Sequence, residues 1–97
     1  MSVPLNEIIY EKDFRKDVLR LPNKVQDKLA SLIGILRENA FDERLHTKSL
    51  GPPLQGAFSF RIIRGYRVCF EFVAPYTVKL LIADTRGNIY RRLLRKR

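Results

Sequence analysis

Residues 57–82 read AFSFRIIRGYRVCFEFVAPYTVKLLI, and this stretch decides the fold of the 97-residue chain. Large apolar side chains alternate with polar or small ones in three runs, over residues 58–62, 66–72 and 78–82. An alternation with period two is typical of a β-strand that buries one face. The third run is apolar at nearly every position, which predicts a central strand covered on both faces.

The breaks between the three runs are short. Arg64-Gly65 separates the first two runs, and a turn around Ala74-Pro75-Tyr76 separates the second from the third. Connections of this length join antiparallel neighbours, so the runs predict an antiparallel meander. The register of the first two strands stays open. A strict two-residue turn would place Arg61 and Arg67 on opposite faces of the sheet, whereas a bulge would bring both to one face.

Upstream of the meander, the sequence predicts one strand and two helices. Residues 7–11 (EIIYE) are short and β-branched, as in an opening strand. Apolar residues recur at helical spacing over residues 13–21 and again over residues 23–38. Pro22 separates the two helices, because proline suits the first turn of a helix and disfavours helical backbone just before it. Asn39 is placed to end the second helix, and the two helices form a hairpin.

The remaining segments complete the predicted architecture. Residues 39–56 show no clear period and contain two glycines and two prolines, which predicts a loop over a functional surface. Residues 86–97 predict a short C-terminal helix with six basic groups: Arg86, Arg91, Arg92, Arg95, Lys96 and Arg97. Residues 1–97 are thus predicted to form a single α+β domain of order β-α-α-β-β-β. Its helix hairpin covers an antiparallel sheet made of the meander and the N-terminal strand.

The charge of the chain is strongly positive and unevenly distributed. Nineteen Lys and Arg residues stand against ten Asp and Glu residues, which gives a net charge of +9. Residues 1–48 hold nine basic and eight acidic groups, a balance of +1, whereas residues 49–97 hold ten basic groups and two acidic ones, a balance of +8. A field of one sign over part of a surface attracts polyanions. We therefore expect a nucleic acid or an acidic protein as partner.

Composition also limits the function classes. Cys69 is the only cysteine, so an internal disulfide and a cysteine-based zinc site are excluded. No segment has the roughly 20 apolar residues that span a bilayer, and the N-terminus does not resemble a signal peptide. We expect a cytoplasmic protein without membrane contact, metal or cofactor. Cys69 is expected to be a small buried hydrophobe, and His46, alone in the loop, a polar surface residue.

Several short motifs along the chain carry a family resemblance. They are Leu21-Pro22 between the helices, Lys48-Ser49-Leu50 before the glycine-bearing loop, Phe60-Arg61, Gly65-Tyr66-Arg67-Val68, and RGNIYR at residues 86–91. In this order and spacing, over residues 7–94, the chain resembles the RelE/ParE superfamily of type II toxin–antitoxin toxins. The resemblance is closer to the RelE branch, the mRNA interferases.

The resemblance implies a ribosome-dependent endoribonuclease that cuts mRNA in the ribosomal A site and so inhibits translation. Members cleave without a metal, because the 2′-hydroxyl of the RNA attacks the adjacent phosphate. This chemistry needs cations around the phosphate and groups that move protons. The implied catalytic residues are Arg61, Arg67, Arg86 and Tyr90. The implied RNA-binding residues are Lys48, Arg64, Arg91 and Arg92.

The chain departs from some relatives near its C-terminus. Conventional ribonucleases of the superfamily pair a glutamate with a C-terminal histidine, but no histidine follows His46. The chain therefore resembles the Arg/Lys-rich subtype, which depends on the ribosome for part of its chemistry. Asp84 and Thr85 stand where many relatives have a basic residue or histidine. Their presence makes this chain less typical of a fully active ribonuclease. Asp84 is expected to be a strand terminus or a salt-bridge partner for Arg86. Glu71 is expected to pair with Arg67 or Lys79 rather than to serve as a base.

Two other functions stay open at this point. A ParE-type toxin would share the fold and inhibit DNA gyrase, and a catalytically silent relative would bind only nucleic acid or an antitoxin. In each case the resemblance implies a RelB-like acidic antitoxin as partner. The contact with operator DNA would be indirect, through that antitoxin. The excess positive charge predicts an acidic antitoxin segment and an encounter that weakens with salt.

Overall fold

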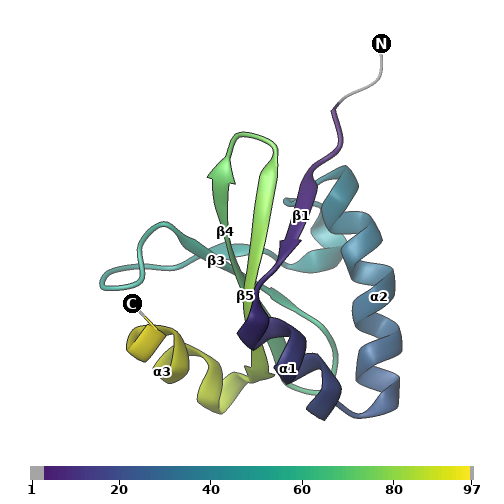
Figure 1. Ribbon diagram of the computed structural model, residues 1–97, viewed down its shortest axis with the longest axis vertical. Coiled ribbons are helices and arrows are strands. Elements are labelled where there is room, and N and C mark those ends of the chain that lie inside the picture. The colour runs from purple at the N-terminus through teal and green to yellow at the C-terminus, as the bar shows by residue number, and fades with distance from the viewer. Residues whose placement is uncertain (1–3, 97) are drawn as a thin grey trace.

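The computed structural model describes residues 4–96 and confirms the α+β fold (Figure 1). The elements follow one another as β1 (Glu7–Tyr10), α1 (Lys12–Arg20), α2 (Asn23–Glu38), the 3-10 turn η1 (Glu43–Leu45), β2 (Lys48–Ser49), β3 (Ala57–Arg61), β4 (Tyr66–Ala74), β5 (Thr77–Thr85) and α3 (Arg86–Lys96). The predicted helix hairpin, the meander and the C-terminal helix are all present. The segment 39–56, predicted as a loop, also contains η1 and the short strand β2.

The five strands form one sheet in the order β1-β5-β4-β3-β2. Neighbours from β5 to β2 are antiparallel, as the meander predicted. The N-terminal strand differs, because β1 pairs with β5 in parallel, and the prediction of a purely antiparallel sheet was wrong in this respect. A parallel pair needs a long connection, and here the helix hairpin and the first two strands of the meander lie between β1 and β5.

Helices cover both faces of the sheet, and β5 lies between β1 and β4, as predicted for the third apolar run. On one face α1 and α2 bury a core that includes Phe14, Leu29, Leu32, Phe60 and Phe70. On the other face Ile89 and Leu93 of α3 pack on a smaller cluster that includes Ala57, Cys69, Leu81 and Ile82. Each fully buried large side chain stabilises the fold by about 1.5–3 kcal/mol.

Because of a bulge in β5, this strand contributes large side chains to the cores on both faces of the sheet. Cys69 of β4 lies opposite Ile82, whereas the next residue, Phe70, lies opposite Leu80, so Leu81 is an extra residue. Leu80 faces the core of α1 and α2, and Ile82 faces α3. The alternation of period two in the sequence puts Leu80 and Ile82 on the same face of the sheet. The bulge separates them, because an inserted residue reverses the side-chain pattern beyond it.

Helix α1 covers the part of β5 that β1 leaves open. β1 ends opposite Leu80, and the Glu11 amide then donates to the Leu80 carbonyl before the chain enters α1. Further along β5, the amide of Ala83 donates to Oδ2 of Asp17 at 3.0 Å. Asp17 is only 4% exposed, so its carboxylate takes the place of a strand partner at this edge.

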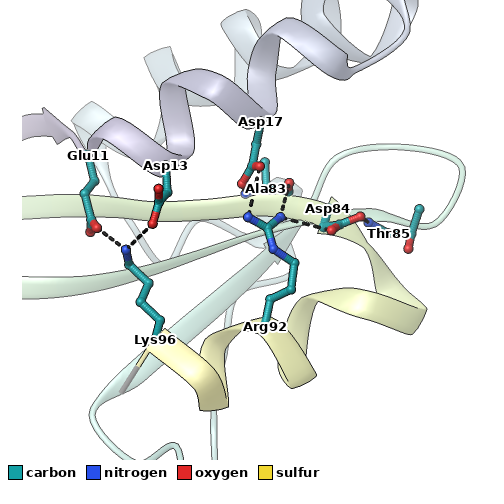
Figure 2. A network of polar contacts seen from close by, with 8 residues as sticks. All are labelled: Glu11, Asp13, Asp17, Ala83, Asp84, Thr85, Arg92 and Lys96. Carbon is teal, nitrogen blue, oxygen red and sulfur yellow. Dashed lines mark hydrogen bonds and ion pairs between the residues drawn. The ribbon is translucent and has the colours of Figure 1, made fainter.

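Two cations of α3 bind the carboxylates around α1 (Figure 2). Arg92 binds Asp17 and Asp84, each at 3.0 Å, and Lys96 binds Glu11 and, at 2.8 Å, Asp13. The ion pairs join the last helix to the first, and Asp17 is the most buried of the four carboxylates. They fix where α3 lies against the sheet.

Replacing Asp17 with Ala should lower the free energy of unfolding by about 2–4 kcal/mol. The substitution leaves a buried amide without its acceptor and breaks a largely buried ion pair. Urea denaturation followed by circular dichroism measures this change. Asp13→Ala is the matched control, because it removes a half-exposed carboxylate from the same helix and should shift the midpoint little. Equal losses in the two variants would contradict the role given to Asp17.

Candidate functional site

The register of β3 and β4 answers the question that the sequence left open. Arg61 lies directly opposite Arg67, so the two side chains share one face of the sheet. The turn between them makes this possible, because Arg64 and Gly65 both have positive φ, 54° and 82°, and the Ile62 amide bonds to the Tyr66 carbonyl. Like charges directly opposite each other destabilise a sheet. Two facing arginines are therefore better suited to binding an anion than to holding the fold.

No carboxylate in residues 4–96 forms an ion pair with Arg67. Asp84 lies opposite Arg67 in the β4–β5 register, but its carboxylate binds elsewhere. One oxygen accepts from the Thr85 amide at 2.6 Å, and the other binds Arg92 at 3.0 Å. Of the two roles expected for Asp84, the pairing with Arg86 is wrong, since Arg92 binds the carboxylate, and Asp84 does lie near the end of β5. The charge of the Arg61–Arg67 pair remains open to a ligand.

Tyr90 is held over the same face of the sheet by a serine. Its hydroxyl lies 3.2 Å from Oγ of Ser59, and the Lys48 ammonium lies 5.7 Å from the centre of its ring. Ser59 is fully buried and lies opposite Lys48 in the β2–β3 register. Ser59 and Arg61 are two residues apart on β3, or about 7 Å along the strand. The phenol is thus anchored next to the facing arginines.

Arg86 and Arg64 lie at the end of this face. The Arg86 amide donates to the Gly65 carbonyl at 2.6 Å, which joins the start of α3 to the β3–β4 turn. Both arginine side chains are exposed. Arg86 and Tyr90 are one turn apart on α3, as their spacing predicted. We call the set Lys48, Arg61, Arg64, Arg67, Arg86 and Tyr90 the basic face.

The other two residues predicted to bind RNA make hydrogen bonds or ion pairs of their own. Arg91 is exposed on α3 and donates to Oδ1 of Asn88 at 2.7 Å. Arg92 binds Asp17 and Asp84, so its guanidinium has a structural role. Arg97, the last of the predicted basic tail, lies outside the described residues. No local pattern in the sequence indicates the Arg92 contacts, because Asp17 is far away along the chain.

Ser59 is a site residue that sequence reasoning missed. In an alternating strand, a serine between two phenylalanines is usually a solvent-exposed residue, and no local signal contradicts that interpretation. Its burial depends on α3, which follows much later in the chain and places Tyr90 over it. The hydrogen bond to Tyr90 gives this buried hydroxyl its partner.

The basic face offers cations and a phenol but no strong base. His46 is exposed and has positive φ at the end of η1, and Glu71 lies opposite Lys79 in the β4–β5 register. Within residues 4–96, no group of three His, Cys, Asp or Glu side chains could hold a metal ion. A guanidinium group offers several N–H donors and no acceptor, and a phenol can donate its O–H. Such a face can stabilise negative charge and donate a proton.

Comparisons with known proteins place this arrangement among solved structures. No protein-family model matches the sequence, and no curated protein matches it. The toxin–antitoxin complex RelBE2 from Mycobacterium tuberculosis contains a chain with a TM-score of 0.70 and 27% identity, and the match covers 87% of this chain and all of that one. This chain has the fold of the RelE-like toxin superfamily.

Two further structures match the RelE-like fold over most of the chain. The archaeal RelE–RelB complex from Pyrococcus horikoshii has a TM-score of 0.70 at 19% identity, and the match covers 86% of this chain and 97% of that one. YafQ from Escherichia coli has a TM-score of 0.72 at 16% identity, with 88% and 98% covered. In residues 4–96, no helix is long and apolar enough to span a membrane.

Cys69 should react with iodoacetamide at pH 8 more than 100-fold more slowly in the native protein than in urea. The side chain is fully buried beneath α3, and burial raises the pKa of its thiol to about 12. The thiol therefore stays protonated at pH 8, with roughly one part in ten thousand as thiolate, whereas a free cysteine has a pKa near 8.5. Mass spectrometry measures the rates. Comparable rates in both states would show that the thiol is accessible.

Proposed function

We propose that this protein is the toxin of a type II toxin–antitoxin system and a ribosome-dependent endoribonuclease that cleaves mRNA. The observation that carries the proposal is the facing pair Arg61–Arg67 with Tyr90 anchored beside it. Two guanidinium groups that face each other suit a phosphate, because each offers several N–H donors to its oxygens. The RelE-like fold and its toxin neighbours give independent support.

In the proposed reaction, the 2′-hydroxyl of the RNA attacks the adjacent phosphorus and the bond to the 5′-oxygen of the next nucleotide breaks. The 2′-proton passes to an acceptor supplied by the ribosome as the new bond forms, and the 5′-oxygen takes up a proton from a donor of the basic face, which regains it from solvent. Arg61 and Arg67 stabilise the negative charge that develops on the phosphate oxygens. Tyr90 orients the reacting hydroxyl or stacks on a base, and Arg86, one helical turn away, contacts the phosphate or the leaving oxygen.

The proposed reaction needs the ribosome because the basic face supplies no strong base. Cations and a phenol stabilise charge and donate protons, so the acceptor of the 2′-proton has to come from the ribosome. A ribosome that holds the message in the A site would fix the geometry of the RNA and exclude water, which contributes part of the rate. The protein would then act in the cytoplasm, where translation takes place.

The proposed physiological inhibitor is an acidic, RelB-like antitoxin. Two of the matching structures are complexes of a RelE-like toxin with its antitoxin. An acidic segment laid over the basic face would neutralise Arg61, Arg67 and Arg86 and exclude RNA. Contact with operator DNA would come through the antitoxin. The encounter should weaken with salt, since it depends on exposed charges.

Arg67→Ala and Arg86→Ala should each lower cleavage of mRNA on purified, programmed ribosomes by about 100-fold or more. Each change removes a donor that acts on the developing charge, a loss of this order in other enzymes. Sequencing of mRNA 5′ ends measures the cuts, and circular dichroism checks the fold. Arg37→Ala is the matched control, an exposed arginine at the end of α2, and should cleave like the wild type.

Other outcomes would give a different function. Unchanged cleavage by both Arg67→Ala and Arg86→Ala would contradict the site. If the wild-type protein binds ribosomes without cutting, the protein is a catalytically silent relative. DNA breaks with intact mRNA after induction in cells would favour inhibition of gyrase.

A further inference from the structure

The charge of the N-terminal half differs from what its sequence suggests. Residues 1–48 are nearly neutral by count, with nine basic and eight acidic groups. In the structure, however, Glu11, Asp13 and Asp17 bind Lys96 and Arg92 of α3. These carboxylates therefore neutralise cations of α3 and leave the cations of α1 without a carboxylate partner within residues 4–96. The charge balance of +1 over residues 1–48 therefore does not describe the surface of α1.

The cations of α1 lie on the side of the helix that faces solvent. Lys12, Arg15, Lys16 and Arg20 are all exposed, and no ion pair within residues 4–96 includes any of them. We call these four residues the α1 outer face. Lys12, Lys16 and Arg20 recur every four residues and so form a row with steps of about 6 Å. The core-facing side of the same helix carries Phe14, which is 2% exposed.

The α1 outer face and the basic face lie on opposite sides of the sheet. α1 packs through Phe14 on the core that it shares with α2, whereas the basic face is on the side that α3 covers. Figure 1 shows α1 and α3 as separate layers beside β5. A short single strand bound at Arg61 and Arg67 would not run along the outer side of α1. The cations of the α1 outer face are therefore suited to contact a part of the partner other than the strand bound at Arg61 and Arg67.

We propose that the α1 outer face docks on the phosphate backbone of a folded RNA while the basic face receives the substrate strand. This inference rests on the proposed function, in which the substrate is presented by an RNA-rich particle. Lys and Arg side chains on phosphates position a protein without reading sequence. A protein partner would need an apolar centre in its interface. Within α1 the only exposed large apolar side chain is Leu19, at 82%.

Lys12→Gln/Lys16→Gln tests the docking surface with purified bacterial 70S ribosomes as the probe. Both side chains are exposed, so the fold should be unaffected. The double variant should bind about tenfold or more weakly, and the slope of log K against log salt should fall by about 2, roughly 1 for each phosphate that is no longer neutralised. The control, Lys28→Gln/Arg37→Gln, removes the same charge from α2 and should bind like the wild type. Binding is measured by sedimentation at several salt concentrations.

A third variant separates RNA from a protein partner. Leu19→Ser should leave ribosome binding unchanged, because phosphate contacts do not use this side chain. If Leu19→Ser and Lys12→Gln/Lys16→Gln both weaken antitoxin binding and leave ribosome binding intact, the surface serves a protein and the proposal is overturned. Equal ribosome binding by the α1 variant and its α2 control would also overturn it, as would a wild-type protein that does not bind ribosomes.

Cleavage and binding distinguish this inference from the proposed function. A wild-type protein that binds ribosomes through the α1 outer face but leaves mRNA intact would refute the ribonuclease and keep the docking surface. Cleavage that is abolished in Arg67→Ala, together with wild-type binding by Lys12→Gln/Lys16→Gln, would refute the docking surface alone.

Discussion

The buried carboxylate of Asp17 is the contact on which the rest of the structure depends. β1 covers only part of β5, and the open edge beyond Leu80 would leave the Ala83 amide without a partner. Asp17 accepts that amide and also binds Arg92, so one side chain closes the sheet edge and fixes α3. Because α3 carries Arg86 and Tyr90, an acid on the first helix sets the position of the candidate site on the far side of the sheet. A buried ion pair adds little net stability over an apolar pair, but it specifies one arrangement strongly.

The same ion pairs divide the cations of α3 by role. Arg92 and Lys96 bind carboxylates around α1 and are neutralised, whereas Arg86, at the start of the helix, is exposed and forms no ion pair within residues 4–96. Asp84 could have neutralised Arg67 across the strands, but Arg92 binds it. The acids near the basic face thus pair with structural cations, and the facing arginines keep their charge. This arrangement costs stability at Arg61 and Arg67, and two facing guanidinium groups suit an anionic ligand.

The sequence was sufficient for local structure and insufficient for contacts between distant segments. Period-two and helical spacing predicted the strands and helices with bounds close to the observed ones, since one buried face or stripe determines each element. The direction of β1, the bulge at Leu81 and the burial of Ser59 depend on elements far away in the chain. The sequence did not determine whether Arg61 and Arg67 lie on the same face of the sheet. A turn that is one residue longer or shorter shifts the strand register and moves a side chain to the other face. The charge balance of each half does not describe the folded surface, because ion pairs join residues 11–17 to residues 92–96.

A site made of cations and a phenol acts only on a substrate that is held in the correct position. Electrostatic stabilisation acts only where the charge develops, so in the proposed reaction the scissile phosphate must be placed correctly between Arg61 and Arg67. A flexible RNA strand would lose much conformational freedom to reach that geometry by itself. A partner that already holds the strand removes this cost, provided that it also holds the protein. Under the two proposals, cations on both sides of the sheet meet this requirement, because the basic face receives the substrate strand while the α1 outer face docks on the RNA that presents it.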